Sequence, residues 1–145
     1  LNLEAPAEAA RLVLPGMLTR RWGRIVNVAS TAGLKGYAYV SAYVAAKHGL
    51  VGLTRALAQE VASKGVTVNA VCPGFTDTDL VARSVEAITG KTGRSEDEAR
   101  AALAASNPQG RLITPDEVAA TIIWLCGDDA SGINGAAVPV AGGEL

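Results

Sequence analysis

Two stretches of the sequence decide the fold: residues 23–30, GRIVNVAS, and residues 64–75, KGVTVNAVCPGF. In each, a glycine precedes a run of β-branched and apolar residues, and a turn follows, Ser-Thr-Ala-Gly after the first run and Pro73-Gly74 after the second. Near-continuous apolar runs of this length are typical of strands that are buried on both faces of a parallel sheet. The sequence therefore predicts two buried strands, the second over Val66–Val71.

Helical patterns flank both strands. Apolar residues recur at helical spacing from Leu3 to Leu18, where Pro15 is expected to weaken or kink the last turn. A second helix is predicted from Ser41 to Ser63, where Ala, Leu and Val recur throughout. Because a strand, a helix and a strand in succession form a right-handed crossover, the two strands are predicted to be parallel.

A polar segment follows the second strand. Residues 77–112 are rich in charge, and Gly90, Gly93 and Gly110 are expected to act as breaks within them. The stretch SEDE, Ser95 to Glu98, is a capping box that predicts the start of a short helix. We interpret this segment as a helical insert in the alternating pattern.

The C-terminal part of the chain supplies the last helix and strand. The stretch TPDE, from Thr114 to Glu117, is a second capping box, and its helix is predicted to run to about Cys126. The stretch GAAVPVAGG, residues 135–143, is predicted to be a third short strand. The sequence therefore predicts an α/β fold in one domain, residues 1–145: a Rossmann-like doubly wound parallel sheet, C-terminal portion only, with about three strands and flanking helices.

The narrow width of this sheet has a consequence. The stretch RIVNVAS, residues 24–30, is apolar on both faces, and without neighbours it would leave an aggregation-prone edge. The chain begins at Leu1, inside a helical pattern. We therefore expect further strands to precede Leu1.

Composition limits the classes of function. A net charge of −1 argues against nucleic acid or an anionic membrane as the main partner. No apolar run approaches the roughly 20 residues that span a bilayer, and no signal peptide is recognised. Cys72 and Cys126 lie far apart in apolar runs, so buried, reduced thiols in a cytoplasmic protein are expected rather than a disulfide. No cluster of metal-ligating residues is present, so no metal is expected.

The candidate chemistry lies where the strands end. Ligands bind parallel α/β sheets beyond the carboxyl ends of the strands, and Ser30 and Pro73-Gly74 stand at two such ends. Tyr43 and Lys47 are four residues apart at the start of the intervening helix, so their side chains share one face. A free tyrosine has a pKa of about 10, and a nearby ammonium favours the phenolate, which would suit proton transfer.

Each of these features also has a plain structural explanation. A tyrosine and a lysine four apart in a helix are common, Ser30 could be a turn residue, and Pro73-Gly74 could be only a turn. Asn2 could cap the first helix. The same holds for two polar residues nearby, since Asn69 could be a satisfied core amide and His48 a packing residue. Only the joint spacing favours catalysis.

Taken together, these motifs resemble the C-terminal half of a classical short-chain dehydrogenase/reductase. LNL at residues 1–3 is similar to the helix asparagine of the family, GRIVNVAS to its catalytic-serine strand, and YVAAK at residues 43–47 to its Tyr-x-x-x-Lys motif. VTVNAVCPGFTDTDL at residues 66–80 is similar to its Pro-Gly segment, and the stretch from residue 107 to residue 143 to its last helix and strand. The resemblance covers essentially the whole chain.

The resemblance implies an NAD(P)-dependent oxidoreductase and a role for each matching residue. Tyr43 would be the general acid/base, and Lys47 would lower its pKa and bind the nicotinamide ribose. Ser30 would orient the substrate oxygen, and Asn2 would complete a proton relay. Four residues after the second strand would lie along the cofactor, which is NAD or NADP: Pro73, Gly74, Thr76 and Thr78. Residues 77–112 would be the substrate lid.

The substrate class also follows from the resemblance. WGRIVNVASTAG at residues 22–33, AAKHGLVGLTRALA at residues 45–58 and NAVCPGF at residues 69–75 look most like 3-oxoacyl-thioester reductases and polyketide ketoreductases. The expected reaction is therefore hydride transfer between the nicotinamide cofactor and a 3-oxoacyl or 3-hydroxyacyl thioester. Four cations of residues 77–112 could meet a substrate phosphate, although solvated helix-face charges are the favoured interpretation: Lys91, Arg94, Arg100 and Arg111.

One departure keeps a second function open. The family's glycine-rich pyrophosphate turn does not occur in this sequence, and the residue that selects NAD or NADP cannot be read. Ala141 also stands where the family often has Asp. The alternative is a truncated, non-catalytic chain that acts only as an oligomerisation module, as a dimer or tetramer through the helices that carry Asn2 and Tyr43. Small residues that suit such packing, unless they face the sheet, are Ala42, Ala45, Ala46, Gly49 and Gly52.

Overall fold

The structure is a computed structural model that describes residues 1–145. Helix α1 (Glu4–Arg20) leads into strand β1 (Gly23–Val28), and helix α2 (Ser41–Val61) leads into strand β2 (Val66–Pro73). Helices α3 (Asp79–Thr92) and α4 (Glu96–Ala104) follow, and helix α5 (Pro115–Cys126) precedes strand β3 (Ala137–Val140). The predicted order of elements and the α/β class are confirmed.

The three strands form one parallel sheet in the order β1-β2-β3. Gly23 pairs with Val66 and Val28 with Val71, and at the other edge Ala70 pairs with Ala137. Strand β2 is therefore central, and seven of its eight residues are buried, Pro73 being the exception. Strand β1 pairs with no other strand at its outer edge, where Val28 is 49% exposed.

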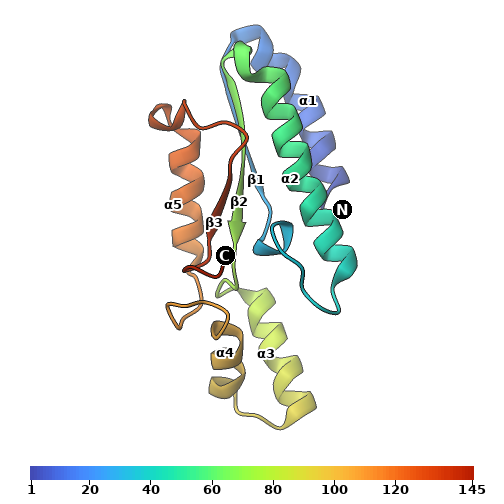
Figure 1. Ribbon diagram of the computed structural model, residues 1–145, viewed down its shortest axis with the longest axis vertical. Coiled ribbons are helices and arrows are strands. Elements are labelled where there is room, and N and C mark those ends of the chain that lie inside the picture. The colour runs from blue at the N-terminus through green and yellow to red at the C-terminus, as the bar shows by residue number, and fades with distance from the viewer.

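Helices cover both faces of the sheet, so the molecule has three layers. Helices α1 and α2 lie side by side on one face and α5 covers the other (Figure 1). Alternate residues of β2 serve the two faces: Val66, Val68, Ala70 and Cys72 belong to the clusters packed under α2, and Val71 to the cluster under α5. This period of two is what a pleated strand requires.

Residues 77–112 form a helical hairpin that extends beyond the carboxyl ends of the strands (Figure 1). The hairpin has its own small core, in which Val81 and Val85 of α3 pack against Ala99 of α4. Gly90, expected to be a break, lies inside α3, because the apolar face of that helix is anchored by α4. Gly93 ends α3 in a left-handed conformation, as expected of a break.

Local details differ from the sequence analysis at several ends. Helix α1 ends at Arg20, two residues beyond the predicted Leu18, with Pro15 inside it. Strand β2 extends two residues beyond the prediction, through Cys72 to Pro73. Both capping boxes form as predicted, at Ser95 and Thr114. None of the helices combines the length and the apolarity that a membrane span requires.

The two cysteines differ from each other. Cys72 is buried in β2, as predicted, but Cys126 is exposed, so the prediction that both are buried was wrong. The reason is that Cys126 is the last residue of α5 and lies off its sheet-facing side, which Val118 and Leu125 occupy. Both thiols are free.

Candidate active site

Lys47 lies at the centre of the candidate site. The residue is only 8% exposed, and its Nζ donates a hydrogen bond of 2.9 Å to the carbonyl oxygen of Val28, the last residue of β1. The same Nζ lies 5.7 Å from the centroid of the Tyr43 ring. Helix α2 thus places the ammonium group at a strand end and beside the tyrosine.

Burial governs the electrostatics around Lys47. Desolvation lowers the pKa of Lys47, and the neighbouring Cys72 sulfur opposes this in part. Burial likewise raises the pKa of the Cys72 thiol, against the smaller effects of the Ser30 backbone N–H, Arg55 and Lys47. Cys72 is therefore a neutral group beneath Ser30 and Lys47, and the ammonium group is poorly solvated.

Ser30 stands directly beyond β1 in an extended conformation. Its Oγ accepts a hydrogen bond of 3.1 Å from the backbone N–H of Ala32 and so caps the short 3-10 turn Thr31–Gly33. Because this bond uses a lone pair, the hydroxyl proton of Ser30 can still be donated. Tyr43 is 39% exposed and accessible from solvent. Ser30 and Tyr43 thus each offer a hydroxyl group, and the Tyr43 ring lies next to the buried Lys47 ammonium group.

The four predicted cofactor residues gather at the end of β2. Pro73 is the last residue of the strand, and Gly74 follows it; a Cβ at Gly74 would lie 2.9 Å from Glu144 Oε2 and 3.2 Å from Ala141 Cβ. Thr76 Oγ1 donates to the Gly74 carbonyl oxygen at 3.0 Å, and Thr78 Oγ1 donates to the Thr76 carbonyl oxygen at 3.2 Å. Both hydroxyl oxygens keep lone pairs that can accept from a ligand.

A pocket of about 310 Å³ opens beside these residues, at the strand ends and against α5. Eight residues line it: Val28, Pro73, Thr76, Thr78, Pro115, Val118, Ala119 and Ile122. The lining is apolar apart from two threonines, and a mostly apolar wall with a few polar groups is typical of a small-molecule pocket.

Asn2 lies apart from these groups. It is exposed, precedes the cap residue Leu3 of α1, and makes no hydrogen bond to Ser30, Tyr43 or Lys47. It does not cap α1 either, since no side-chain cap bond is present. Its neighbour Leu3 packs against Gly49 of α2, where a Cβ would lie 2.9 Å from Leu3 Cδ2. Asn2 therefore stands near α2 without direct contact to the other candidates.

Two of the structural alternatives can be decided from the hydrogen bonds. Asn69 is a satisfied core amide: its Nδ2 donates to the Ile133 carbonyl oxygen at 2.8 Å and its Oδ1 accepts from the Ala136 N–H at 3.0 Å. His48 is not a packing residue, because it is exposed on α2 with Nδ1 3.0 Å from the Val44 carbonyl oxygen.

The four candidate cations of residues 77–112 divide into two kinds. Arg100 is paired with Asp77 at 2.5 Å and Arg111 with Glu117 at 2.6 Å. Lys91 and Arg94 are exposed and have no carboxylate partner. The first two are therefore committed within the chain, and the other two are solvated.

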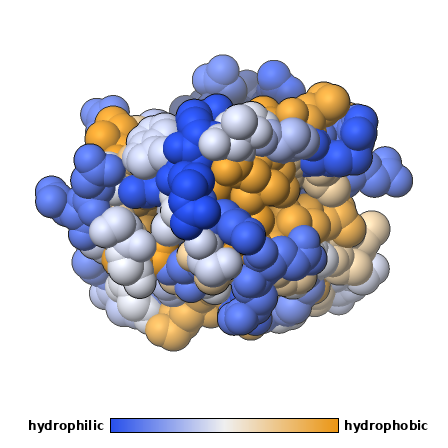
Figure 2. Space-filling model, turned by 90° about the horizontal axis from the view of Figure 1, so that it is seen from above, coloured by the Kyte–Doolittle hydropathy of each residue, from blue (hydrophilic) through white to orange (hydrophobic).

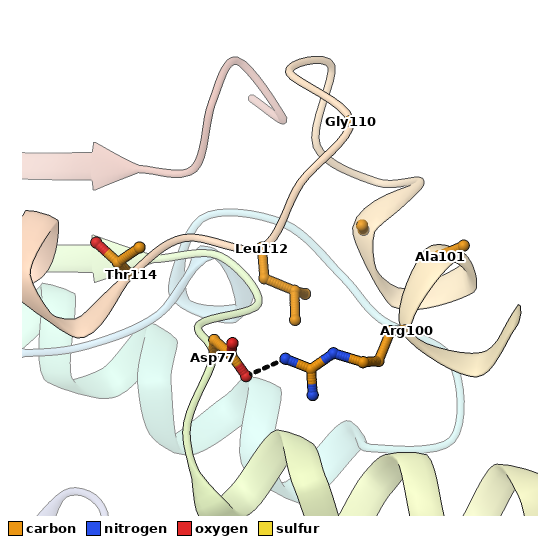
Figure 3. Close-up of a pocket in the computed structure, with 7 residues that line it drawn as sticks. Asp77, Arg100, Ala101, Gly110, Leu112 and Thr114 are labelled. Carbon is orange, nitrogen blue, oxygen red and sulfur yellow. Dashed lines mark hydrogen bonds and ion pairs between the residues drawn. The ribbon is translucent and has the colours of Figure 1, made fainter. Parts of the chain in front are cut away.

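The Arg100–Asp77 pair bridges a second pocket, of about 320 Å³, in which the arginine side chain reaches from α4 toward the segment after β2 (Figure 3). Its lining residues are Asp77, Arg100, Ala101, Ala104, Gly110, Leu112 and Thr114. Because none of the candidate catalytic or cofactor residues lines this pocket, it is not the candidate active site.

One cluster next to Ser30 was missed by the sequence analysis. The Glu144 side chain is 1% exposed and is paired with Lys35 at 3.0 Å, and Tyr37 donates to the same carboxylate. No spacing signal could reveal it, because Glu144 lies more than a hundred residues from its partners: 109 for Lys35 and 107 for Tyr37.

Comparisons with known proteins place this geometry in context. The family described as Enoyl-(Acyl carrier protein) reductase matches residues 1–144. The chain is 46% identical over 144 residues to a D-beta-hydroxybutyrate dehydrogenase of Cupriavidus necator, covering 99% of the chain and 56% of that protein. It is 44% identical over 142 residues to the 3-oxoacyl-[acyl-carrier-protein] reductase FabG of Pseudomonas aeruginosa, covering 98% of the chain and 53% of that protein.

A solved structure agrees with these matches. The crystal structure of an actinorhodin polyketide ketoreductase variant with NADPH superposes with a TM-score of 0.93 at 41% identity, over 99% of this chain and 56% of that one. The chain thus spans about half the length of the proteins that it matches. Identity of this level along nearly all 145 residues, together with the shared fold, shows that the chain belongs to the short-chain dehydrogenase/reductase family.

Proposed function

We propose that the protein containing these residues is an NAD(P)-dependent oxidoreductase that interconverts a carbonyl group and a secondary alcohol. The observation that carries the proposal is the buried Lys47 ammonium group, which is fixed by the Val28 carbonyl oxygen and lies beside the accessible Tyr43. Ser30 stands two residues beyond Val28, at the same strand end. This arrangement can hold an oxygen atom and move a proton to it.

The residues of the chain fit a nicotinamide group. The 310 Å³ pocket offers apolar walls for a ring, and the lone pairs of Thr76 and Thr78 can accept from a carboxamide. Gly74 has no side chain because Glu144 and Ala141 pack directly against it, which keeps the chain close to the end of β2. Pro73, Gly74, Thr76 and Thr78, with Tyr43 and Lys47 at the ribose, would hold the cofactor. When bound, it supplies or accepts the hydride.

Tyr43 and Ser30 would handle the substrate oxygen. The Ser30 Oγ–H donates to that oxygen and orients it, and Tyr43 Oη delivers the proton as the carbonyl becomes an alcohol. In the opposite direction Tyr43 Oη removes the proton. The Lys47 ammonium group is fixed by the Val28 carbonyl oxygen and places a positive charge beside the Tyr43 ring. Asn2 would complete the proton relay.

The proposed substrate class is a 3-oxoacyl or 3-hydroxyacyl thioester. Two of the relatives are named for oxygen at the third carbon of an acyl chain, and one of these for an acyl carrier protein. The hairpin of α3 and α4 lies beyond the strand ends, where a substrate must enter, and would serve as the lid. Lys91 and Arg94 are exposed cations of this hairpin.

Two finer points belong to the same proposal. The cofactor is NAD or NADP; the solved relative contains NADPH, and no residue of this chain selects between them. A cytoplasmic protein is proposed because the Cys72 and Cys126 thiols are free.

The second candidate function is association without catalysis. The chain would then form a homo-oligomer, a dimer or a tetramer, through α1 and α2. Leu12 and Val13 of α1 are exposed apolar residues, and Ala42, Ala45 and Gly52 of α2 are exposed rather than directed at the sheet. These surfaces suit contact with another copy of the chain. The two functions are compatible, and only the absence of turnover would favour association alone.

The test is Tyr43→Phe in the whole protein, assayed with NADPH and NADH on acetoacetyl thioesters. We expect turnover to fall by at least about 100-fold, because the proton donor is removed, while cofactor binding by nicotinamide fluorescence stays near that of the parent. Tyr39→Phe is the matched control, since Tyr39 is fully exposed and makes no hydrogen bond through its hydroxyl. Turnover of Tyr43→Phe within tenfold of the parent would remove Tyr43 from this role.

A further inference from the structure

A buried carboxylate lies outside the proposed catalytic groups. Glu144 follows β3, and its side chain is almost fully buried. A buried charge is costly unless it is paired and hydrogen-bonded. Lys35 Nζ lies 3.0 Å from Glu144 Oε1 and donates to the Glu144 carbonyl oxygen at 3.3 Å, and Tyr37 donates its hydroxyl proton to the same Oε1. Glu144 therefore ties the segment after β3 to the loop between β1 and α2.

The direction of the hydrogen bonds extends this contact toward the active site. A carboxylate only accepts, so the single proton of Tyr37 is used on Glu144. The Tyr37 oxygen must then accept from its other neighbour, Thr31 Oγ1, at 2.7 Å. Burial has the largest effect on the pKa of Tyr37 and raises it, and the hydrogen bond to Glu144 raises it further. The phenol therefore keeps its proton. The chain of donors runs from Thr31 through Tyr37 to Glu144.

Thr31 is the residue next to Ser30. It begins the buried 3-10 turn Thr31–Gly33, in which Gly33 N–H donates to the Ser30 carbonyl oxygen at 2.8 Å and Leu34 N–H to the Thr31 carbonyl oxygen at 2.9 Å. The same turn supplies the Ala32 N–H that holds Ser30 Oγ. The orientation of the Ser30 hydroxyl thus depends on a turn whose first side chain is held by Tyr37.

The segment after β3 that carries Glu144 is also held in place by its neighbours. A Cβ at Gly142 would collide with Asn107, which follows α4, and Gly142 has a φ of +61°. Glu144 N–H donates to the Ala141 carbonyl oxygen at 3.2 Å, and Glu144 Oε2 lies against Gly74 without a donor. The carboxylate is therefore held by backbone packing and can act as an anchor for Tyr37.

We propose that Glu144 is a positioning residue for Ser30, which it orients through Tyr37 and Thr31. This inference rests on the proposed function in that Ser30 is taken to hold the substrate oxygen. Glu144 itself touches neither substrate nor reacting atoms. Its role is to fix the turn that aims the Ser30 hydroxyl.

The test uses Tyr37→Phe and Glu144→Gln in the whole protein, with Tyr39→Phe as the matched control. Tyr37→Phe removes the link between Thr31 and Glu144 and leaves the Lys35 ion pair in place. We expect kcat to fall by about tenfold in Tyr37→Phe, with KM for the cofactor within twofold of the parent. Amide hydrogen exchange at Gly33 and Leu34 should become about tenfold faster, while exchange in β2 stays unchanged. Glu144→Gln keeps an oxygen that can accept from Tyr37 but loses the Lys35 ion pair, so its effect on kcat and on exchange should be smaller than that of Tyr37→Phe. Tyr39→Phe should match the parent.

The two measurements separate the possible failures. Unchanged exchange at Gly33 and Leu34 in both variants would overturn the proposal, and so would faster exchange with an unchanged kcat. Equal loss of protection throughout the sheet would also overturn it, because Glu144 would then serve stability alone. If the parent turned over no carbonyl substrate, the proposed function would fail; selective loss of protection would still support Glu144 as the anchor of the Ser30 turn.

Discussion

At the scale of the residue, Lys47 combines a cost to the fold with a use in the site. Burial lowers the pKa of Lys47, which means that the folded state disfavours the charged form. Lys47→Met keeps an unbranched side chain one atom shorter, and it removes the charge together with the hydrogen bond to the Val28 carbonyl oxygen. We expect turnover to fall by at least about 100-fold and cofactor affinity to weaken, while the melting temperature stays equal or rises. Thermal unfolding and nicotinamide fluorescence on the same sample measure both effects.

The pH dependence of stability has a definite sign. The pKa of Lys47 in the folded state lies below its ordinary value of 10.5. At a pH between the folded pKa and 10.5, the unfolded chain binds more protons than the folded chain. The contribution of Lys47 to stability therefore rises with pH in this range. Lys47→Met should lack this rise. A melting temperature of the variant that falls by several degrees at neutral pH would instead make Lys47 a structural residue.

The two cysteines give a second prediction at this scale. Cys126 is exposed and Cys72 is buried with a raised pKa, so the native protein should react with a thiol reagent at one position only. We expect Cys126→Ser to abolish the fast reaction with dithionitrobenzoate and Cys72→Ser to leave it unchanged. Two equally fast thiols would show that β2 opens readily.

How far the sequence predicts the site depends on the distance between the residues involved. Tyr43 and Lys47 share a face because a helix brings residues four apart together, and their contact could be read from spacing. The bond from Lys47 to the Val28 carbonyl oxygen spans 19 residues and needs the packing of α2 on β1. Glu144 carries no local signal at all, because only the closure of the sheet brings it to the Ser30 loop.

At the scale of the element, the starts of α4 and α5 were predictable and the core of the α3–α4 hairpin was not. Ser95 caps α4 and Thr114 caps α5, each together with a glutamate three residues later in the chain. This spacing can be read directly from the sequence. Helix α3 was not predicted as a separate element, because its glycine and charges conceal an apolar face that becomes visible only against Ala99.

The capping box of α5 should contribute measurably to the fold. Thr114 Oγ1 accepts from the Glu117 N–H, and Glu117 accepts in return from the Thr114 N–H at 2.8 Å. We expect Thr114→Ala to lower the free energy of unfolding by about 1 kcal/mol in denaturant titrations followed by circular dichroism. Ser95→Ala is the matched variant in α4, where the effect should be confined to the hairpin. Equal effects on the sheet would contradict the separate hairpin core.

Acid should weaken the same box in a defined range. Hydrogen bonds lower the pKa of Glu117 to about 2, and the bond from Arg111 has the largest effect, followed by those from Thr114. The carboxylate therefore contributes fully above its ordinary value of 4.5, and the contribution is lost as the pH falls toward about 2. Glu117→Gln should flatten the pH dependence of stability in this range. A variant that kept the dependence of the parent would assign it to other carboxylates.

At the scale of the whole molecule, much apolar surface is open. One end of the molecule shows hydrophobic side chains gathered between hydrophilic ones (Figure 2). Strand β1 has an unpaired outer edge, and the side chains of Leu12, Ile123 and Trp124 are exposed on the helices. Open strand edges and large apolar patches favour association. The apolar pattern of residues 24–30 predicted a buried strand, but only Gly23 and Asn27 of β1 are buried, because no strand or helix covers its outer edge.

The last prediction follows from this surface. When residues 1–145 are produced by themselves, we expect light scattering after gel filtration to give a mass well above the 14.8 kDa of one chain, because the β1 edge and the exposed helix faces associate. The same material should not bind NADPH by nicotinamide fluorescence, since it has no glycine-rich pyrophosphate turn, whereas the whole protein should. A monomer that binds NADPH would show that the strand ends and the 310 Å³ pocket are sufficient to hold the cofactor. A defined oligomer of the whole protein with neither binding nor turnover would instead favour association as its function, with Tyr43 and Lys47 retained in the fold but unused in catalysis.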